Sequence, residues 1–190
     1  MRSLYSYRKY LKKISWKIRS FYFGKLVCDI EKQIKIDCEF YRSQGAKIGK
    51  KVRPYSPIYS GEPYLITIGD NVTISKQVVF ITHDSSILTF NGHKYGNIYG
   101  EIKIGSNVFI GWGAIFLPGT SIGDDCIVAA GSVITKKWDQ NGIILGGNPA
   151  KVIGSTTDYI KRRKENFIDG KDKYAKDLQN HVLNHVDKFL

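Results

Sequence analysis

The residue with the clearest capacity for acid–base chemistry is His83, within the run Phe80-Ile81-Thr82-His83-Asp84. Histidine exchanges a proton near neutral pH, so a histidine held in fixed geometry suits the role of a general base. His83 follows a regularly repeating segment and precedes a long irregular one, which places it where a rigid wall meets a loop. His93 is a competing candidate, but it lies inside the irregular segment, where its position is less constrained. We expect His83 to be the base; the alternative is a histidine that only anchors the loop.

The wall beside His83 is predicted by a repeat of six residues. An apolar residue recurs at every sixth position, at Ile104, Ile110, Phe116, Ile122, Val128 and Ile134. A compact residue follows each of the first five four places later, at Val108, Ala114, Thr120, Cys126 and Ser132. Neither the period of a helix nor that of a strand requires this lattice. A period of six predicts a β-solenoid, in which three hexads, about eighteen residues, close one triangular coil.

The same lattice begins earlier in the chain, with interruptions. It is fitted by Ile48, Val52, Ile68, Val72, Ile74, Val78 and Phe80. The proline-containing run of residues 54–63 breaks the rhythm and predicts a looped coil. After Phe80 the lattice requires apolar residues at three positions and instead meets Ser86, Gly92 and Ile98. Residues 81–103 are therefore predicted to be an excursion from the solenoid, and long loops on a rigid scaffold often carry function.

The composition is that of an ordinary globular protein of 190 residues, with 42% hydrophobic and 24% charged residues. Three cysteines, an odd number, argue against a disulfide framework and favour a reducing cytosol. No stretch has the length needed to span a membrane and the N-terminus lacks a signal-peptide pattern, so we expect a cytoplasmic protein. His181 and His185 lie four residues apart, but no third ligand accompanies them and no metal site is expected.

The formal net charge of +12 is concentrated near the N-terminus. No acidic residue precedes Asp29, whereas the basic residues there are Arg2, Arg8, Lys9, Lys12, Lys13, Lys17, Arg19 and Lys25. A basic amphipathic helix is predicted by the helical spacing of Leu4, Tyr7, Leu11, Ile14 and Ile18. We expect such a helix to cap the open end of the solenoid. The alternative is docking on an anionic membrane face or an acidic glycan, and the two roles are compatible. Nucleic acid is not an expected partner, because no recognised binding motif accompanies the charge.

Three further segments, together with the lattice and His83-Asp84, give the chain a resemblance to a known family. The segments are Gly61–Gly69, Gly131–Lys136 and the most specific one, Gly146–Ile153 with the sequence GGNPAKVI. Over about residues 45–165 the chain resembles the hexapeptide-repeat acyltransferases, and more narrowly the sugar O-acetyltransferases of bacterial capsule, O-antigen and exopolysaccharide synthesis. The resemblance implies a left-handed β-helix, a homotrimer, and acetyl-CoA bound between neighbouring subunits. The handedness rests on the resemblance alone, since crossovers between parallel strands are usually right-handed.

These expectations give an all-β solenoid with helices at both ends. Residues 1–44 form a basic N-terminal helical capping segment, and residues 45–153 form the left-handed β-helix catalytic domain with its excursion at 81–103. Residues 154–190 form a C-terminal helical segment, in which Ser155–Asp158 offers the N-cap of a helix that begins at Tyr159 and weakens near Asp169-Gly170.

The reaction that the resemblance implies is transfer of an acetyl group from acetyl-CoA to a sugar hydroxyl. His83 would take the hydroxyl proton while the oxygen attacks the thioester directly, without an acyl-enzyme. Asp84 or Glu62 would orient the imidazole, and both remain open, because Glu62 lies one coil earlier and can stack beneath His83. A backbone N–H of a neighbouring coil would stabilise the oxyanion.

The resemblance also implies where acetyl-CoA binds. The pantetheine arm would follow the coil positions Trp112, Gly113, Ala130 and Gly131. Lys136 and Lys151, on the late coils, would meet the CoA phosphates. The alternative for Gly113 and Gly131 is that they serve only the corners of the coil.

Four other classes of function are compatible with parts of this pattern. A γ-type carbonic anhydrase needs three zinc-binding histidines, and only His83 and His93 lie in the body of the chain. A serine acetyltransferase would carry a larger helical domain before the coil. An N-acetyltransferase of an amino nucleotide sugar and a non-catalytic β-helix scaffold remain the alternatives. For the acceptor we expect a lipid-linked or soluble precursor of a surface polysaccharide, with the N-terminal segment raising residence at the inner membrane face.

Overall fold

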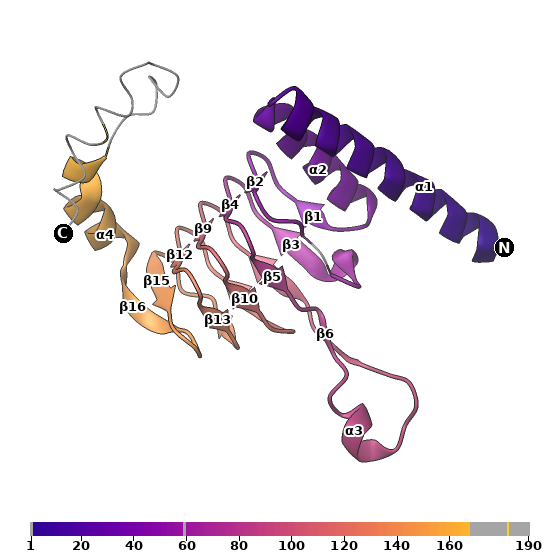
Figure 1. The fold of residues 1–190 in the computed structure, drawn as a ribbon. Helices are drawn as coiled ribbons and strands as arrows, with labels where there is room; N and C mark the ends of the chain where they lie inside the picture. Colours follow the sequence, from indigo (N-terminus) through magenta and orange to yellow (C-terminus); the bar gives the residue numbers. More distant parts are fainter. Residues whose placement is uncertain (1, 59, 168–181, 183–190) are drawn as a thin grey trace.

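The computed structural model describes residues 2–58, 60–167 and 182. They form a three-sided solenoid of short strands, with two helices stacked on one end and a terminal strand and helix on the other (Figure 1). The first face holds β1 (Lys47–Ile48), β3 (Ile66–Ile68), β8 (Ile102–Ile104), β11 (Ser121–Ile122) and β14 (Lys137–Trp138). The second face holds β2 (Arg53–Pro54), β4 (Thr73–Ile74), β9 (Phe109–Ile110), β12 (Ile127–Val128), β15 (Ile143–Gly146) and β16 (Lys151–Ser155). The third holds β5 (Val79–Phe80), β10 (Ile115–Phe116) and β13 (Val133–Ile134).

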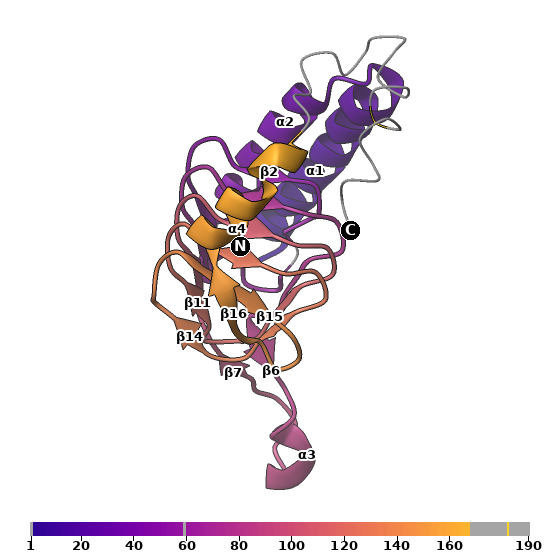
Figure 2. The ribbon, with the colours of Figure 1, turned by 90° about the vertical axis from the view of Figure 1, so that its left-hand side faces the viewer.

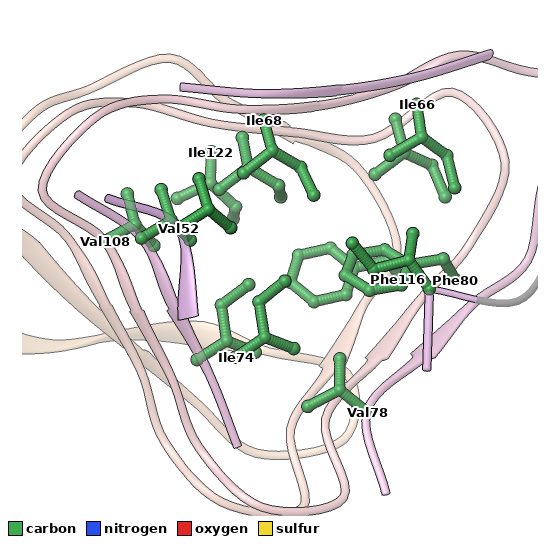
Figure 3. Packing of buried hydrophobic residues seen from close by; sticks show 14 of the residues in the cluster. Val52, Ile66, Ile68, Ile74, Val78, Phe80, Val108, Phe116 and Ile122 are labelled. Carbon is green, nitrogen blue, oxygen red and sulfur yellow. The ribbon is translucent and has the colours of Figure 1, made fainter. Parts of the chain in front are cut away.

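The predicted hexads correspond to the sides of this prism. Each coil visits the three faces in turn and repeats about eighteen residues later, as when Val133 pairs in parallel with Ile115. The apolar residues at the repeating positions point inward and are buried, and so are the compact residues that follow them at the corners. Figure 3 shows these side chains converging from the three faces, with the rings of Phe80 and Phe116 stacked at a centroid distance of 5.2 Å.

Coils stack so closely that some lattice positions admit only particular residues. A Cβ added to Gly111 would lie 2.5 Å from the backbone nitrogen of Ala130 in the next coil, so a side chain there is excluded. At the corner between the first and second faces, Asn71, Asn107 and Asp125 adopt left-handed backbone with φ of 54°, 57° and 57°. Their side chains form a ladder, in which Asn71 Nδ2 donates to Asn107 Oδ1 at 3.0 Å and Asn107 Nδ2 donates to Asp125 Oδ1 at 3.0 Å.

The first coil is covered by α2 (Ile30–Ser43), which lies against β1 and β2 (Figure 1). Ile36, Cys38 and Tyr41 of this helix are buried. The Arg42 guanidinium donates from Nε to the carbonyl of Ile48 at 2.9 Å and from Nη2 to that of Gly49 at 2.7 Å. These carbonyls lie at the exposed end of the stack of strands. Helix α2 therefore covers the apolar core and, through Arg42, also donates hydrogen bonds to carbonyl groups at the unpaired edge.

The long first helix, α1 (Arg2–Phe21), does not cover the coil itself but packs on α2. Its continuation η1 (Tyr22–Leu26) is a short π-helix. Trp16 anchors the contact: its Nε1 donates to Asp37 Oδ1 at 2.6 Å, and its ring stacks on Phe40 at 4.3 Å. Capping therefore falls to α2, whereas the predicted apolar stripe of α1 stays exposed at Leu11, Ile14 and Ile18. The side chains of Leu4 and Tyr7 are outside those described.

The excursion is a hairpin arm that leaves the prism between its third and first faces. Its base is the antiparallel pair β6 (His83–Asp84) and β7 (Ile98–Tyr99), and its tip carries the short helix α3 (Leu88–Asn91). The arm projects away from the solenoid in both ribbon views (Figures 1 and 2). The coil resumes at Ile102, slightly before the end of the predicted 81–103 excursion.

At the far end, β16 runs antiparallel to β15 and closes the second face. Helix α4 (Thr156–Arg163) follows, and the 3-10 turn η3 (Lys164–Asn166) extends it. Ser155 is its N-cap and accepts from Asp158 N at 3.1 Å, so the helix begins three residues before the predicted start at Tyr159. The predicted break near Asp169-Gly170 and the pair His181 and His185 fall outside the described residues. No helix in the described part of the chain has the length and hydrophobicity to span a membrane.

The three cysteines are free thiols and differ in exposure, which makes them reporters of this fold. Burial raises the pKa of Cys38 to about 11 and also raises that of Cys126, whereas Cys28 is exposed. Since the thiolate is the reactive form, we predict that Ellman's reagent modifies Cys28 rapidly and the other two only after unfolding. The Cys28→Ser variant should lose the fast phase. A second fast thiol in native wild-type protein would contradict the burial of Cys38 in α2 or of Cys126 in the solenoid.

Candidate active site

His83 lies where the solenoid wall gives way to the arm. It is the first residue of β6 and follows Thr82, which is 1% exposed and anchors the chain at this corner. The imidazole side chain is 39% exposed, so it can be reached from solvent although the residue before it is buried. Across the hairpin its strand partner is Tyr99, whose ring centroid lies 6.1 Å from that of His83.

The partner of the imidazole comes from the coil below. Glu62 precedes the 3-10 turn η2 (Pro63–Leu65) of the first coil, and its Oε2 lies 2.9 Å from His83 Nδ1. The same carboxylate oxygen accepts from Thr82 Oγ1 at 2.7 Å. Ser60 completes the cluster, because its hydroxyl lies 3.0 Å from Thr82 Oγ1 and accepts from the backbone N–H of Glu62 at 3.0 Å.

These contacts keep Glu62 ionised. Partial burial acts to raise the pKa of its carboxyl group, but the hydrogen bonds from Thr82 and His83, together with the charge of a protonated His83, lower it below the ordinary value. An ionised carboxylate only accepts hydrogen bonds, so the proton between the two groups resides on Nδ1 of the imidazole. The other ring nitrogen, Nε2, is then the one with a free lone pair.

Asp84, the other residue proposed to orient the imidazole, has a different partner. Its Oδ1 accepts from the backbone N–H of Ser86 at 2.7 Å, and this local turn is the main reason that the pKa of Asp84 is lowered. The structure therefore brings Glu62, not Asp84, to the nitrogen of His83. His93 is exposed on the arm, and its backbone N–H donates to Asn91 Oδ1 at 3.0 Å.

Two residues beside His83 were not singled out in the sequence. Thr82 is buried directly before the histidine, and a buried hydroxyl needs a hydrogen-bond partner. A threonine at this position therefore indicates a polar partner near His83, which the structure shows to be Glu62. Gly61 lies against the ring: a Cβ there would be 3.3 Å from His83 Cε1, so any larger residue would crowd the imidazole. Only stacking of the first coil on the second reveals this contact.

The predicted cofactor residues gather at another corner, between the second and third faces. Gly131 N donates to the carbonyl of Trp112 at 2.8 Å, which joins the Trp112-Gly113 and Ala130-Gly131 corners of successive coils. The Trp112 ring is 51% exposed, and its Nε1 donates to Gln77 at 2.8 Å. A Cβ at Gly113 or Gly131 would meet nothing within 4 Å, so this strip of wall has room for a narrow, extended ligand. Both glycines also have φ of 70°, a left-handed conformation that favours glycine, so the turn at the corner is enough to explain why glycine occurs at these two positions.

The two candidate lysines lie on late coils, as expected, but at different corners. Lys136 sits on the same corner as His83, and its ammonium group lies 4.4 Å from the centre of the Trp138 ring. Lys151 is exposed at the start of β16. The preceding turn lies over β13, where Ala150 N donates to the carbonyl of Val133 at 2.9 Å.

Within one copy of the chain, the candidate base and the candidate cofactor wall are not adjacent. His83 follows β5, at the edge of the third face next to the first. Trp112 precedes β10, at the opposite edge of that same face. The whole width of the third face therefore separates the acid–base pair from the open strip of wall. In the described ranges, no three His, Cys, Asp or Glu side chains gather into a group that could hold a metal ion.

Known proteins share this architecture and sequence. Residues 101–136 match the family model of the hexapeptide repeat of succinyl-transferase. The chain is 45% identical over 130 residues to Protein CapG of Staphylococcus aureus, covering 66% of this chain and 74% of that protein. It is 36% identical over 108 residues to galactoside O-acetyltransferase of Escherichia coli, covering 53% of this chain and 49% of that protein. A hexapeptide-repeat acetyltransferase of Vibrio cholerae, solved with acetyl coenzyme A, aligns with TM-score 0.55 and 27% identity over 60% of this chain and 61% of that one.

The hydrogen bond from Thr82 should be measurable as a pKa difference. We predict that Thr82→Val raises the pKa of Glu62 towards its ordinary value, because it removes a donor to the ionised carboxylate. The measurement is a pH titration of the labelled carboxyl carbon by NMR. Thr67→Val, on the first face, is the matched control and should leave Glu62 unchanged. An unaltered titration in Thr82→Val would contradict the proposed donor.

Proposed function

The chain belongs to the family of hexapeptide-repeat acetyltransferases, and we propose that it moves an acetyl group from acetyl-CoA to a sugar hydroxyl, with His83 as the general base. The family membership confirms the expected fold: the repeat predicted a β-solenoid, and the resemblance implied a left-handed parallel β-helix with helices at its ends. The observation that carries the proposed chemistry is the contact between Glu62 Oε2 and His83 Nδ1, which leaves Nε2 as the basic atom.

The proton transfer follows from this pair. A sugar hydroxyl is a weak nucleophile until a base takes its proton during the attack, and the His83 side chain is 39% exposed, with Nε2 not used by Glu62. Glu62 holds the ring in the tautomer with the proton on Nδ1 and stabilises the imidazolium that forms. Acetyl-CoA supplies the acetyl group as an activated thioester: the hydroxyl oxygen bonds to the carbonyl carbon, the C–S bond breaks, and coenzyme A leaves as the thiol with the proton that His83 took. No cysteine takes part: Cys38 and Cys126 are buried, and Cys28 lies between η1 and α2.

The proposed cofactor site is the open strip at Trp112, Gly113, Ala130 and Gly131. An extended pantetheine chain needs a long, narrow surface, and these small residues provide one beside an exposed indole ring. Lys136 and Lys151 provide positive charge on the late coils for the CoA phosphates. A backbone N–H of a neighbouring coil would serve as the oxyanion donor.

The separation of the two half-sites supports assembly into a homotrimer. His83 lies at one edge of the third face, and the cofactor strip lies at the opposite edge. When copies are arranged around a rotation axis, His83 of one copy can lie beside the strip of the next copy. Each interface then holds one complete site. A single copy has the base and the strip on different corners, so catalysis in this proposal requires assembly.

For the acceptor we propose a hydroxyl of a surface-polysaccharide precursor, made in the cytoplasm and either soluble or lipid-linked at the inner membrane face. The sugar class is supported by the relation to a galactoside O-acetyltransferase, of which the chain spans about half the length. The intact Glu62–His83 pair argues against a scaffold that has lost its chemistry. A panel of sugars and amino sugars with acetyl-CoA distinguishes O- from N-acetylation.

We predict that His83→Ala lowers kcat for acetyl transfer by roughly 10²-fold or more, the usual contribution of a positioned base. Glu62→Gln keeps the size of the side chain but not its charge, so we expect a smaller loss together with an altered pH–rate profile. The readout is steady-state transfer, with circular dichroism to verify folding.

Asp84→Asn and His93→Ala are the matched controls, since the carboxylate of Asp84 bonds to Ser86 and His93 lies on the arm. Both should turn over near the wild-type rate. A His83→Ala enzyme with near-normal turnover would remove the proposed base.

The cofactor strip is best tested at Ala130, because a side chain at Gly131 would strain a backbone with φ of 70°. We predict that Ala130→Phe raises the KM for acetyl-CoA, while Thr157→Phe on α4 does not. Mixing His83→Ala and Ala130→Phe subunits should then restore activity, because about a quarter of the interfaces in randomly mixed trimers hold both intact halves. No restoration in trimers verified by light scattering would contradict the shared site.

A further inference from the structure

The outer face of α1 is an unusual surface for a helix at the end of a solenoid. Large apolar side chains remain exposed along it: Tyr10 by 61%, Leu11 by 46%, Ile14 by 38%, Ile18 by 63% and Phe21 by 60%. Their spacing places them on one side of the helix, as in an amphipathic helix that buries this stripe against a partner. We call these five residues the α1 stripe.

The α1 stripe is not the side that packs on the protein. Trp16, on the opposite side of the helix, is 9% exposed and makes the contacts with Asp37, Phe40 and Tyr41 of α2. The amphipathic pattern is therefore inverted relative to a capping helix. The Trp16 indole and Ser20, whose Oγ accepts from Gln33 Nε2 at 3.3 Å, hold α1 to α2, and the broad apolar side faces outward. Figure 1 shows α1 as the outermost layer beyond α2 at this end.

The charge around the α1 stripe has one sign. The helix contains no acidic residue, and Lys13 and Lys17 are exposed beside the stripe. Lys12 and Arg19 are also exposed, but they line the groove with Trp16 on the other side of the helix. Lys25 in η1 adds to the same surface charge. A contact between two copies through this face would bring identical basic residues together, because a two-fold contact pairs a patch with itself. The charge thus disfavours a two-fold contact between copies through this face and favours an anionic occupant.

We propose that α1 is a membrane-docking helix, which lies in the headgroup region of a bilayer rich in anionic phospholipid. An interfacial helix buries an apolar side shallowly among the acyl chains while flanking lysines meet lipid phosphates, and α1 supplies both on its outer side. The docking uses no residue of the acetyl-transfer site and stands apart from the proposed chemistry.

Docking in this way also fixes where the candidate active site lies relative to the bilayer. α2 covers the first coil, and His83 belongs to the second, with coils separated by roughly 5 Å as hydrogen-bonded strands are. The Glu62–His83 pair is thus near the membrane-facing end of the solenoid, within reach of an acceptor carried on a lipid. This consequence rests on the proposed function, whereas the docking itself does not.

The test is co-sedimentation of the full chain with vesicles of phosphatidylglycerol and phosphatidylcholine, compared with vesicles of phosphatidylcholine alone. We expect binding to the anionic vesicles, weakening as salt is raised because the lysine contacts are screened. The Ile14→Ser/Ile18→Ser variant should lose most of this binding. Its matched control is Val152→Ser/Ile153→Ser at the far end of the solenoid, with side chains 46% and 63% exposed, which should bind as the wild type does.

A second pair of variants isolates the charge. Lys13→Glu/Lys17→Glu should weaken binding to anionic vesicles by roughly tenfold or more, whereas Lys161→Glu/Lys164→Glu, with the same charge change beyond β16, should not. Acetyl transfer to a soluble acceptor, measured without vesicles, should be unchanged in all four variants, which separates loss of docking from loss of chemistry.

Three outcomes would overturn the proposal. The first is the absence of binding to anionic vesicles, and the second is equal binding to neutral and anionic ones. The third is a change of oligomeric state in Ile14→Ser/Ile18→Ser with vesicle binding retained, which would assign the α1 stripe to contacts between copies.

Discussion

The hydrogen-bonded stacking of one coil on the next is the constraint on which the rest of this molecule depends. Each short strand has only a few backbone pairs, as in the two-residue register of Ile115-Phe116 with Val133-Ile134. Stability therefore requires that the inward side chains of successive coils coincide, so that the core is a continuous column. Phe80 and Phe116 stack for this reason, as do the left-handed corners Asn71, Asn107 and Asp125. A residue's neighbours are thus set by its position in the coil above or below.

The candidate active site uses the same spacing. Glu62 and His83 come from successive coils, and the distance between stacked strands leaves their side chains in hydrogen-bonding contact. Because Thr82 is buried in the wall, the donor that keeps Glu62 ionised is as rigid as the core. His83 is the first residue at the base of the arm, so the arm beyond it can vary in length without moving the acid–base pair. Rigid geometry and an accessible ring nitrogen are thereby combined at one residue.

A solenoid also has two ends, and each exposes unpaired strand edges and apolar core. The far end is closed by the turn of the chain into β16, and the near end by α2 with Arg42 on two carbonyls. Because α2 already covers the core, α1 packs on α2 through Trp16 rather than on the coil. The α1 stripe, on the side opposite Trp16, therefore remains exposed and available to a partner outside the chain.

The sequence by itself determined the solenoid, because a six-residue lattice with apolar residues such as Ile110, Phe116 and Ile122 has no other efficient way to bury them. It also singled out His83, because that residue stands where the lattice stops. Only the tertiary structure decided which carboxylate contacts the imidazole of His83. Asp84 is adjacent to it in sequence but accepts a hydrogen bond from Ser86. Glu62 is 21 residues away and reaches His83 because the coils are stacked. The side of α1 that packs was also beyond the sequence, since periodicity shows that a helix has an apolar stripe and not what covers it. A local pattern fixes which residues share a face; contact between elements depends on how the whole chain is stacked.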